Sequence, residues 1–406
     1  MATTRVMSTA STPIVVILGA TGAGKSQLAL ELAAKYGGEI ISADAMQMYK
    51  GLDIVTNKVS EDEQSLVKHH MINILDPLSV NNVVDFRNRA LPIVEKLLSE
   101  NKIPFICGGT NYYIESLLWK ILVDEDLPFM VNGKRLIDDN YSSANAKALK
   151  SDNKHEIDES EILNIESVDW SNDDGLISTR NLHETLKKVD PERASVLHPK
   201  ERRKIWRSLQ IFYRTGTKHS QILSQKQEGE GKSGFSGELR FGVKNICAIE
   251  VWSEKEILDA RCDKRVDKMM KRGLLNELEQ FHNDFNKLRA DSDSLDNLRY
   301  TRGIWQSIGF KEFHNYLCLT SEERESEQGQ SLFSECVERM KISTRQYSRR
   351  QAKWIRRRFL TSIRESPPVY RVDSSDPSLW KEKVSILFFK KIIIRQFSAV
   401  LEHIFI

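Results

Sequence analysis

Close to the start of the chain stands the sequence Gly19-Ala20-Thr21-Gly22-Ala23-Gly24-Lys25-Ser26. It matches the phosphate-loop pattern G-x-x-x-x-G-K-[ST] at every fixed position. The five apolar residues at 14–18 predict a buried parallel strand before it. Residues 27–36 place apolar side chains on one helical face, and Gly37-Gly38 then ends that helix. The order of strand, loop and helix is the one that the pattern requires.

A loop of this kind binds the phosphates of a polyphosphate compound. Its backbone N–H groups and the N-terminus of the following helix point at the phosphate oxygens. Lys25 would add a positive charge, and Ser26 would be a ligand of Mg²⁺, the cofactor that we expect. The alternative, a glycine loop that arose by chance, is opposed by the agreement of strand, loop, helix and helix stop.

Length and composition bound the class of protein. The length of 406 residues predicts two or three domains. The sequence contains no run of about 20 apolar residues, so we expect no membrane span. The five cysteines form no C-x-x-C pair, which predicts neither a zinc site nor a disulfide framework. No signal peptide is recognisable, so we expect a cytoplasmic protein. Mitochondrial import is the alternative, because residues 1–13 are rich in Ser and Thr. We also expect a monomer.

The alternation of strands and helices predicts an α/β fold. We expect a P-loop NTPase-like parallel sheet flanked by helices, with an inserted, mainly helical domain and a C-terminal helical segment. The stretch after residue 122 is acidic with isolated apolar residues, which is typical of partial disorder. The predicted segments are a disordered N-terminus (1–13), the first part of the P-loop core (14–122), an acidic, partly disordered insertion (123–180), a helical insertion domain (181–240), the second part of the core with a basic C-terminal helix (241–365) and an atypical tail (366–406).

One carboxylate is placed next to the phosphate loop. The second strand, predicted over 39–42, ends just before Asp44, at the sheet edge where ligands bind in open α/β folds. The next strand, 103–107, ends in Gly108-Gly109-Thr110 without the acid that holds Mg²⁺ in typical ATPases. Asp44 is therefore a metal carboxylate, a general base acting on a nucleophile that attacks the bound compound, or an ordinary helix cap.

A long helix is predicted over 334–360, and its two faces differ. The apolar face carries Val337, Met340, Tyr347 and Trp354. The opposite face carries Lys341, Arg345, Arg349, Lys353 and Arg356. Because residues 339–358 contain no acidic residue for i,i+4 pairing, we favour contact with a phosphate backbone over a plain solvated surface.

Three smaller features carry predictions of local structure. Ser253, with Glu256 three residues later, predicts a capping box at the start of a helix. Residues 305–316 predict one further helix. For His69-His70 we favour a hydrogen-bonded structural pair over a ligand role.

A series of short motifs runs along the chain in a fixed order. They are Gly19–Ser26, Ser42-Ala43-Asp44-Ala45-Met46-Gln47, Gly51-Leu52-Asp53 with Thr56-Asn57-Lys58, His69-His70, Asp85-Phe86-Arg87, Gly108-Gly109-Thr110-Asn111-Tyr112-Tyr113, Arg261 to Arg265 and Gln306-Ser307-Ile308-Gly309-Phe310. Together they resemble the tRNA dimethylallyltransferases, also called tRNA isopentenyltransferases, in their eukaryotic form. The resemblance covers about residues 14–360, apart from the insertion.

The resemblance implies a reaction and its partners, tRNA and dimethylallyl diphosphate. A dimethylallyl group would pass to N6 of adenosine 37, next to the anticodon, and diphosphate would leave. Asp44 matches the family's catalytic aspartate and would take the N6 proton, while Thr110 would contact the adenosine. Lys25, the loop amides, Ser26 with Mg²⁺ and Arg265 would neutralise the diphosphate, with Arg261 as the weaker candidate. The residues predicted to bind tRNA are Asp44, Ala45, Met46, Gln47, Thr110, Arg203, Lys204, Arg207, Arg345, Arg349 and Lys353. Because three of them fall within 181–240, this segment is expected to be a tRNA-binding domain.

Three other functions stay open at this point. An adenylate (AMP, ADP or ATP) isopentenyltransferase of cytokinin biosynthesis shares the loop and the aspartate, but Ala45-Met46-Gln47 and the basic helix favour tRNA. A P-loop small-molecule kinase lacks support because the strand-end carboxylate is missing. A non-catalytic RNA-binding protein is opposed by the intact Lys25, Ser26 and Asp44. Eukaryotic members often carry a C-terminal C2H2 zinc finger, which we do not expect here because no cysteine follows Cys336.

Overall fold

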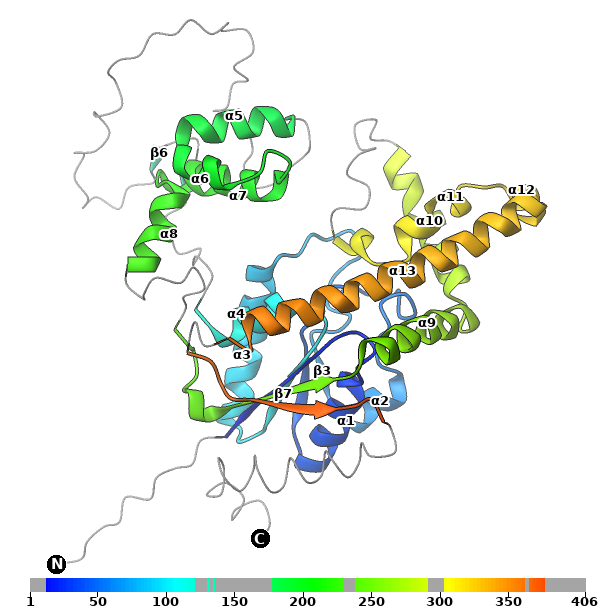
Figure 1. Ribbon diagram of the computed structural model, residues 1–406, viewed down its shortest axis with the longest axis horizontal. Helices are drawn as coiled ribbons and strands as arrows, with labels where there is room; N and C mark the ends of the chain where they lie inside the picture. The colour runs from blue at the N-terminus through cyan, green and yellow to red at the C-terminus, as the bar shows by residue number, and fades with distance from the viewer. Residues whose placement is uncertain are drawn as a thin grey trace, which may run out of the picture. The chain divides into compact units, whose positions relative to one another are not determined.

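The computed structural model describes residues 12–120, 130–131, 134–135, 177–228, 238–290, 303–361 and 365–376 (Figure 1). The chain forms two compact units. The first comprises Met1–Leu122 and Gly237–Ile406, and the second comprises Val123–Ser236. The boundaries of the six segments predicted from the sequence stay a prediction, apart from the last one, which is corrected below.

The first unit is built on a parallel sheet of six strands in the order β3-β2-β4-β1-β7-β8. Its strands are β1 (Ile14–Gly19), β2 (Glu39–Ser42), β3 (His69–His70), β4 (Pro104–Cys107), β7 (Ile246–Trp252) and β8 (Val369–Asp373). All the pairings between them are parallel. The carboxyl ends of β2, β4 and β1 are therefore adjacent at one edge of the sheet, which is where the three predicted site loops begin.

Helices cover the sheet, and Figure 1 shows the long α13 crossing it. The helices of this unit are α1 (Lys25–Tyr36), α2 (Glu61–Leu66), α3 (Val83–Ser99), α4 (Asn111–Leu118), η3 (Val243–Asn245), α9 (Lys255–Lys271), α10 (Leu274–Ala290), η4 (Gly303–Gln306), α11 (Phe310–Leu317), α12 (Ser321–Glu325) and α13 (Glu327–Arg358). The predicted fold class, a P-loop-like α/β fold, is confirmed. Among the described residues no helix is long and apolar enough to cross a membrane.

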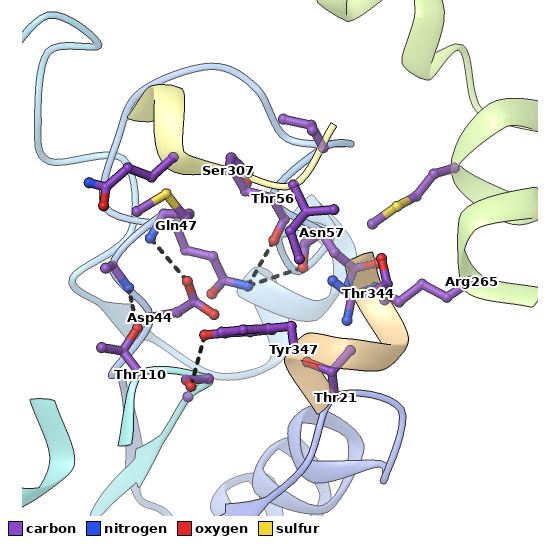
Figure 2. Close-up of a pocket in the computed structure, with 18 of the residues that line it drawn as sticks. Thr21, Asp44, Gln47, Thr56, Asn57, Thr110, Arg265, Ser307, Thr344 and Tyr347 are labelled. Carbon is purple, nitrogen blue, oxygen red and sulfur yellow. Dashed lines mark hydrogen bonds between the residues drawn. The ribbon is translucent and has the colours of Figure 1, made fainter. Parts of the chain in front are cut away.

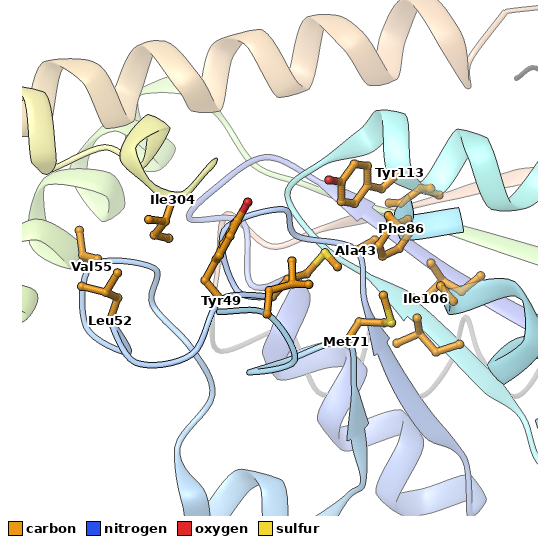
Figure 3. Close-up of a cluster of buried hydrophobic side chains, with 14 of the residues drawn as sticks. Ala43, Tyr49, Leu52, Val55, Met71, Phe86, Ile106, Tyr113 and Ile304 are labelled. Atoms are coloured by element: carbon orange, nitrogen blue, oxygen red, sulfur yellow. The ribbon is translucent and has the colours of Figure 1, made fainter. Parts of the chain in front are cut away.

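The alternation of side chains along β1 divides the core into two layers. Val16 and Leu18 face the cluster that contains Phe86 of α3, whereas Val15 and Ile17 face α1. Figure 3 shows the first cluster, in which the rings of Phe86 and Tyr113 stack with their centroids 4.1 Å apart. Because both faces are covered, β1 is apolar without interruption, as the sequence predicted.

The second unit is helical, with a short antiparallel pair, β5 (Met130–Val131) and β6 (Lys134–Arg135). Its helices are α5 (Thr179–Val189), α6 (Pro191–Val196), α7 (Arg202–Thr215) and α8 (His219–Glu228). Leu182, Leu186, Ile205 and Leu209 form its buried core. Asp190 caps α6 through the N–H of Arg193 and also accepts from the N–H of Ser220 in α8.

Four sequence predictions need correction. The capping box at Ser253 is wrong: Glu254 occupies the N-cap of α9, and the Ser253 hydroxyl contacts that of Ser375. The helix predicted over 305–316 is broken at Gly309, and α13 begins at Glu327 rather than at residue 334. The tail over 366–406 is not separate from the core, because residues 369–373 form β8. The predicted disorder of 1–13 and 123–180 falls largely outside the described residues.

Gly309 separates η4 from α11 because only glycine fits there. Its φ is +126°, and an added Cβ would lie 2.7 Å from Cγ2 of Val55. We predict that Gly309→Ala lowers the free energy of unfolding by roughly 3 kcal/mol or more, combining backbone strain with a clash. Urea unfolding measures this loss.

Gly51→Ala is the matched control. Gly51 also has a positive φ, +65°, but a Cβ there would meet no atom within 4 Å. We expect it to cost about 1 kcal/mol, from backbone strain alone. Equal losses in the two variants would contradict the steric explanation.

Candidate active site

The phosphate loop connects β1 to α1, and two glycines explain its path. A Cβ on Gly19 would lie 2.6 Å from the carbonyl oxygen of Val251 in β7, so the backbones approach too closely for any side chain. Gly24 has a φ of +100° at the N-cap of α1. The side chain of Lys25 curls back, and its Nζ donates to the carbonyl of Ala20 at 2.9 Å. The loop thus forms around an ammonium group that is nearly buried.

A cavity of about 430 Å³ lies at the carboxyl edge of the sheet, in front of this loop. Figure 2 shows its labelled residues, which come from the loops after β1, β2 and β4, from the segment after η4, and from α9 and α13. Of the sequence-predicted residues, those that line it are Thr21, Lys25, Ser26, Asp44, Ala45, Met46, Gln47, Thr110 and Arg265. The loops that carry Lys25, Asp44 and Thr110 meet because their strands are neighbours.

Asp44 is held in place by the loop after β4. Thr110 fixes the segment that carries Asp44: its N–H donates to the carbonyl of Ala43, and its Oγ1 accepts from the N–H of Ala45, both at 3.0 Å. Oδ1 of Asp44 accepts from the N–H of Met46 at 3.0 Å. Residues 45–48 form turns, so the interpretation of Asp44 as a helix cap is wrong. A Cβ on Gly109 would come within 2.8 Å of Oδ2, which explains the glycine.

Among the described residues, four basic side chains, Lys25, Arg265, Lys311 and Arg350, line the cavity together with one carboxylate, Asp44. Burial lowers the pKa of Lys25, the charge of Arg265 lowers it further, and Asp44 opposes the change. Burial likewise lowers the pKa of Arg265, again against the pull of Asp44. The Nε of Arg265 is buried and has no hydrogen-bond acceptor among the described residues. The cavity therefore has an excess of positive charge and an unused donor, which are the properties of an anion site.

Arg261, the weaker candidate, is used elsewhere. Its guanidinium donates to the carbonyl of Ser374 at 2.7 Å and to the Ser374 hydroxyl at 3.3 Å, just after β8. Cys107 also lines the cavity, but burial raises the pKa of its thiol to about 11, so it is no nucleophile at neutral pH.

The C-terminal half of α13 ties two of the site loops together. The side chain of Gln351 accepts from the N–H of Thr21 and donates to the carbonyl of Gly109, both at 2.8 Å. Ser348 donates to the carbonyl of Thr21 at 3.0 Å, and Tyr347 donates to that of Gly109 at 3.1 Å. We call Tyr347, Ser348 and Gln351 the α13 clamp. The sequence placed Tyr347 on an apolar face and gave no signal for the other two, because their partners lie far away in the chain.

The basic stripe on α13 is not a free surface. Lys341 pairs with Asp267 at 2.8 Å, and Arg345 and Arg349 pair with Asp263 and Asp259. These acids recur every fourth residue on α9, so the pairing of the three basic residues is between helices; Lys341 also pairs with Glu338 within α13, at 3.3 Å. The premise of unpaired charge is therefore wrong for these three basic residues, whereas Lys353 has no ion pair within the described residues. Their roles in tRNA binding stay a prediction.

Other predicted residues are also engaged in local structure. Gln47 accepts from the Ser42 hydroxyl at 2.9 Å and donates to the carbonyl of Asn57 at 3.1 Å, as Figure 2 shows in part. Arg203, Lys204 and Arg207 lie on α7, in the second unit.

The His69-His70 pair in β3 is half-buried and hydrogen-bonded. His69 Nδ1 lies 2.7 Å from the carbonyl of Val67, and His70 Nε2 lies 2.6 Å from Oε2 of Glu39. The structural role predicted for the pair is thus supported.

Comparison with known proteins agrees with this geometry. The family model described as IPP transferase matches residues 47–358. The chain belongs to the IPP transferase family. A second model, Isopentenyl transferase, matches residues 12–74. Family membership makes the chain a transferase of the prenyltransferase type, and it confirms the resemblance seen in the motifs.

The relatives are named for one activity. Proteins named tRNA dimethylallyltransferase from Homo sapiens and Mus musculus are each 44% identical over 374 residues, which is 92% of this chain and 72% of theirs. A crystal structure titled as a eukaryotic dimethylallyltransferase acting on tRNA superposes with a TM-score of 0.69 and 28% identity, covering 96% of this chain and 79% of that one.

The α13 clamp yields a prediction for this member of the family. Gln351→Leu would leave the N–H of Thr21 and the carbonyl of Gly109 without their partner, at a cost of about 2–3 kcal/mol in stability. We also expect transfer to slow at least tenfold, because the phosphate loop and the Asp44 loop lose their common support. Thermal unfolding and single-turnover kinetics measure the two effects.

Gln328→Leu, an exposed glutamine on the same helix, is the control and should change neither quantity. If Gln351→Leu behaved like this control, the clamp would have no role in positioning.

Proposed function

We propose that this chain is a tRNA dimethylallyltransferase, which transfers a dimethylallyl group from dimethylallyl diphosphate to N6 of the adenosine next to the anticodon. The observation that carries the proposal is that one carboxylate among the described residues, Asp44, shares a cavity with the buried cations Lys25 and Arg265. A kinase or ATPase would be expected to have a further strand-end acid, but Cys107-Gly108-Gly109-Thr110 supplies none.

The cations suit a diphosphate that leaves. In allylic transfer, negative charge grows on the bridging oxygen of the diphosphate as the carbon–oxygen bond breaks. Lys25 and Arg265 line the cavity, and together with N–H groups of the phosphate loop they would receive that charge. Binding the anion also relieves the unfavourable burial of the two cations. Preorganised charge of this kind stabilises the transition state more than the ground state.

Asp44 would act as the general base. The N6 amine of adenine forms a bond to the allylic carbon, the carbon–oxygen bond to diphosphate breaks, and the N6 proton passes to Asp44. Oδ1 is occupied by the N–H of Met46, which leaves Oδ2 for this proton. Thr110 keeps the Asp44 segment at this position through its bonds to Ala43 and Ala45. Because N6 is stacked within an anticodon loop, the base must be flipped out to reach the cavity.

Mg²⁺ fits this site as part of the proposal. The Ser26 hydroxyl lines the cavity at the start of α1 and makes no hydrogen bond to the described residues. Mg²⁺ commonly takes one or two protein oxygens together with phosphate oxygens and water. Ser26 would hold the ion against the diphosphate, where it would supply further charge neutralisation.

The test of the function compares acceptors. Purified protein is given labelled dimethylallyl diphosphate with unmodified tRNA, AMP or ATP in parallel, and we expect label on tRNA alone. Label on AMP or ATP would favour a free-nucleotide isopentenyltransferase, and transfer to none would exclude both.

Asp44→Asn should lower single-turnover transfer to tRNA by about 10²–10⁴-fold with tRNA affinity kept, because Asn still accepts from Met46. Asp62→Asn, on the exposed α2, is the matched control; unchanged turnover in Asp44→Asn would refute the assigned base.

The ion pairs on α13 separate two kinds of basic residue. Lys353→Gln should weaken tRNA binding and lower the salt slope of log K by about one, as expected for a phosphate contact. Arg345→Gln should lower that slope by less, because its guanidinium is already paired with Asp263, and should lower stability by about 0.5–1 kcal/mol through the loss of this partly exposed pair. Filter binding at several salt concentrations distinguishes them, and equal slopes in the two variants would contradict the assignment.

A further inference from the structure

Three metal-ligating side chains meet in a part of the first unit that the reaction does not use. They are His282 of α10, His314 of α11 and Cys318 at the end of α11. Their ligand atoms all lie within 4.8 Å of one another. Within the described parts of the chain, this is the one group of three or more His, Cys, Asp or Glu residues that meets in this way.

The geometry is close to that of a zinc site. His314 and Cys318 are four residues apart, and the N–H of Cys318 donates to the carbonyl of His314, which places both side chains on one helical face. The distance from Cys318 Sγ to His314 Nε2 is 3.8 Å. Zinc bonds of about 2.3 Å to sulfur and 2.05 Å to nitrogen at a tetrahedral angle require about 3.6 Å between those atoms. A small adjustment of the side chains would therefore suffice.

The chemistry of the ligands and their exposure point the same way. Two imidazoles and one thiolate are the nitrogen and sulfur donors that Zn²⁺ prefers. Cys318 is the exposed cysteine of this chain, whereas Cys107, Cys247, Cys262 and Cys336 are buried. An ion can reach Cys318 from solvent. A search for C-x-x-C pairs misses this group, because one ligand comes from another helix.

We propose that His282, His314 and Cys318 form a Zn²⁺ site, with water as the fourth ligand. Because the ligands come from α10 and α11, the ion joins the two helices. Residues 306–308 and Lys311, at the start of α11, line the cavity. Zinc therefore stabilises the segment that forms one wall of the active site. This inference does not rest on the proposed transfer reaction.

Metal binding to the chelator-treated protein is the first test. We expect one equivalent of Zn²⁺ to bind, and Co²⁺ in its place to give the intense visible bands of tetrahedral cobalt and a thiolate charge-transfer band. His282→Asn and Cys318→Ser should each weaken Zn²⁺ binding at least about tenfold, because even the loss of a group that only supports a metal ligand typically has an effect of this size. His198→Asn, an exposed histidine on the second unit, is the matched control and should bind as the parent does. Retention of binding in both ligand variants would overturn the site.

Thiol protection is the second test and needs no cysteine substitution. Alkylation of the native chain should label Cys318 rapidly, because the other thiols are buried. Zn²⁺ should slow this labelling at least tenfold, and a chelator should restore it. In His282→Asn the same Cys318 should stay unprotected, while circular dichroism shows that the variant is folded. No protection in the parent chain, or equal protection in the variant, would refute the proposal.

Discussion

The burial of two cations against one carboxylate is the constraint on which the site depends. Lys25 and Arg265 are withdrawn from water in a cavity where Asp44 is the nearby opposite charge, and burial lowers the pKa of both. Such an excess of positive charge is unfavourable without an anion, so the fold must hold the groups in place by other means. It does so with backbone: three neighbouring parallel strands end at the same edge, and their loops carry the phosphate-binding amides, Asp44 and Thr110.

The long helix α13 holds the phosphate loop and the loop after β4 in fixed positions relative to each other. Its neutral donors and acceptors, Tyr347, Ser348 and Gln351, contact backbone groups of Thr21 and Gly109. Three of its basic residues, Lys341, Arg345 and Arg349, are paired with a matching row of aspartates on α9. Since α9 also carries Arg265, the same interhelical row that neutralises the surface of α13 fixes the position of a site cation. The ion pairs between α9 and α13, which lie outside the cavity, thus help to hold a positive charge within it.

Much of this arrangement could be predicted from local sequence. The strand, loop, helix and stop at 14–38 are determined by apolar runs and glycines, and each lies where the sequence places it. The position of Asp44 follows from strand order, because a carboxylate just after a parallel strand can lie only at the carboxyl edge. Thr110 follows by the same reasoning from β4. These predictions succeed because their causes lie within a few residues of one another.

The predictions that failed share the opposite property. The absence of acidic partners for the basic stripe was inferred from α13 alone, but the partners of Lys341, Arg345 and Arg349 are aspartates that stand about 75–90 residues earlier in the chain. The sequence around Ser253 resembles a helix cap, yet the Ser253 hydroxyl contacts that of Ser375, just after β8 at the edge of the sheet. A spacing of four along one helix can complement the same spacing on another helix packed against it, and no single window of sequence contains both. A basic residue that has no acidic residue near it in the sequence can therefore still be paired in the folded protein. Whether such a residue can bind a nucleic acid depends on the charges that surround it in space.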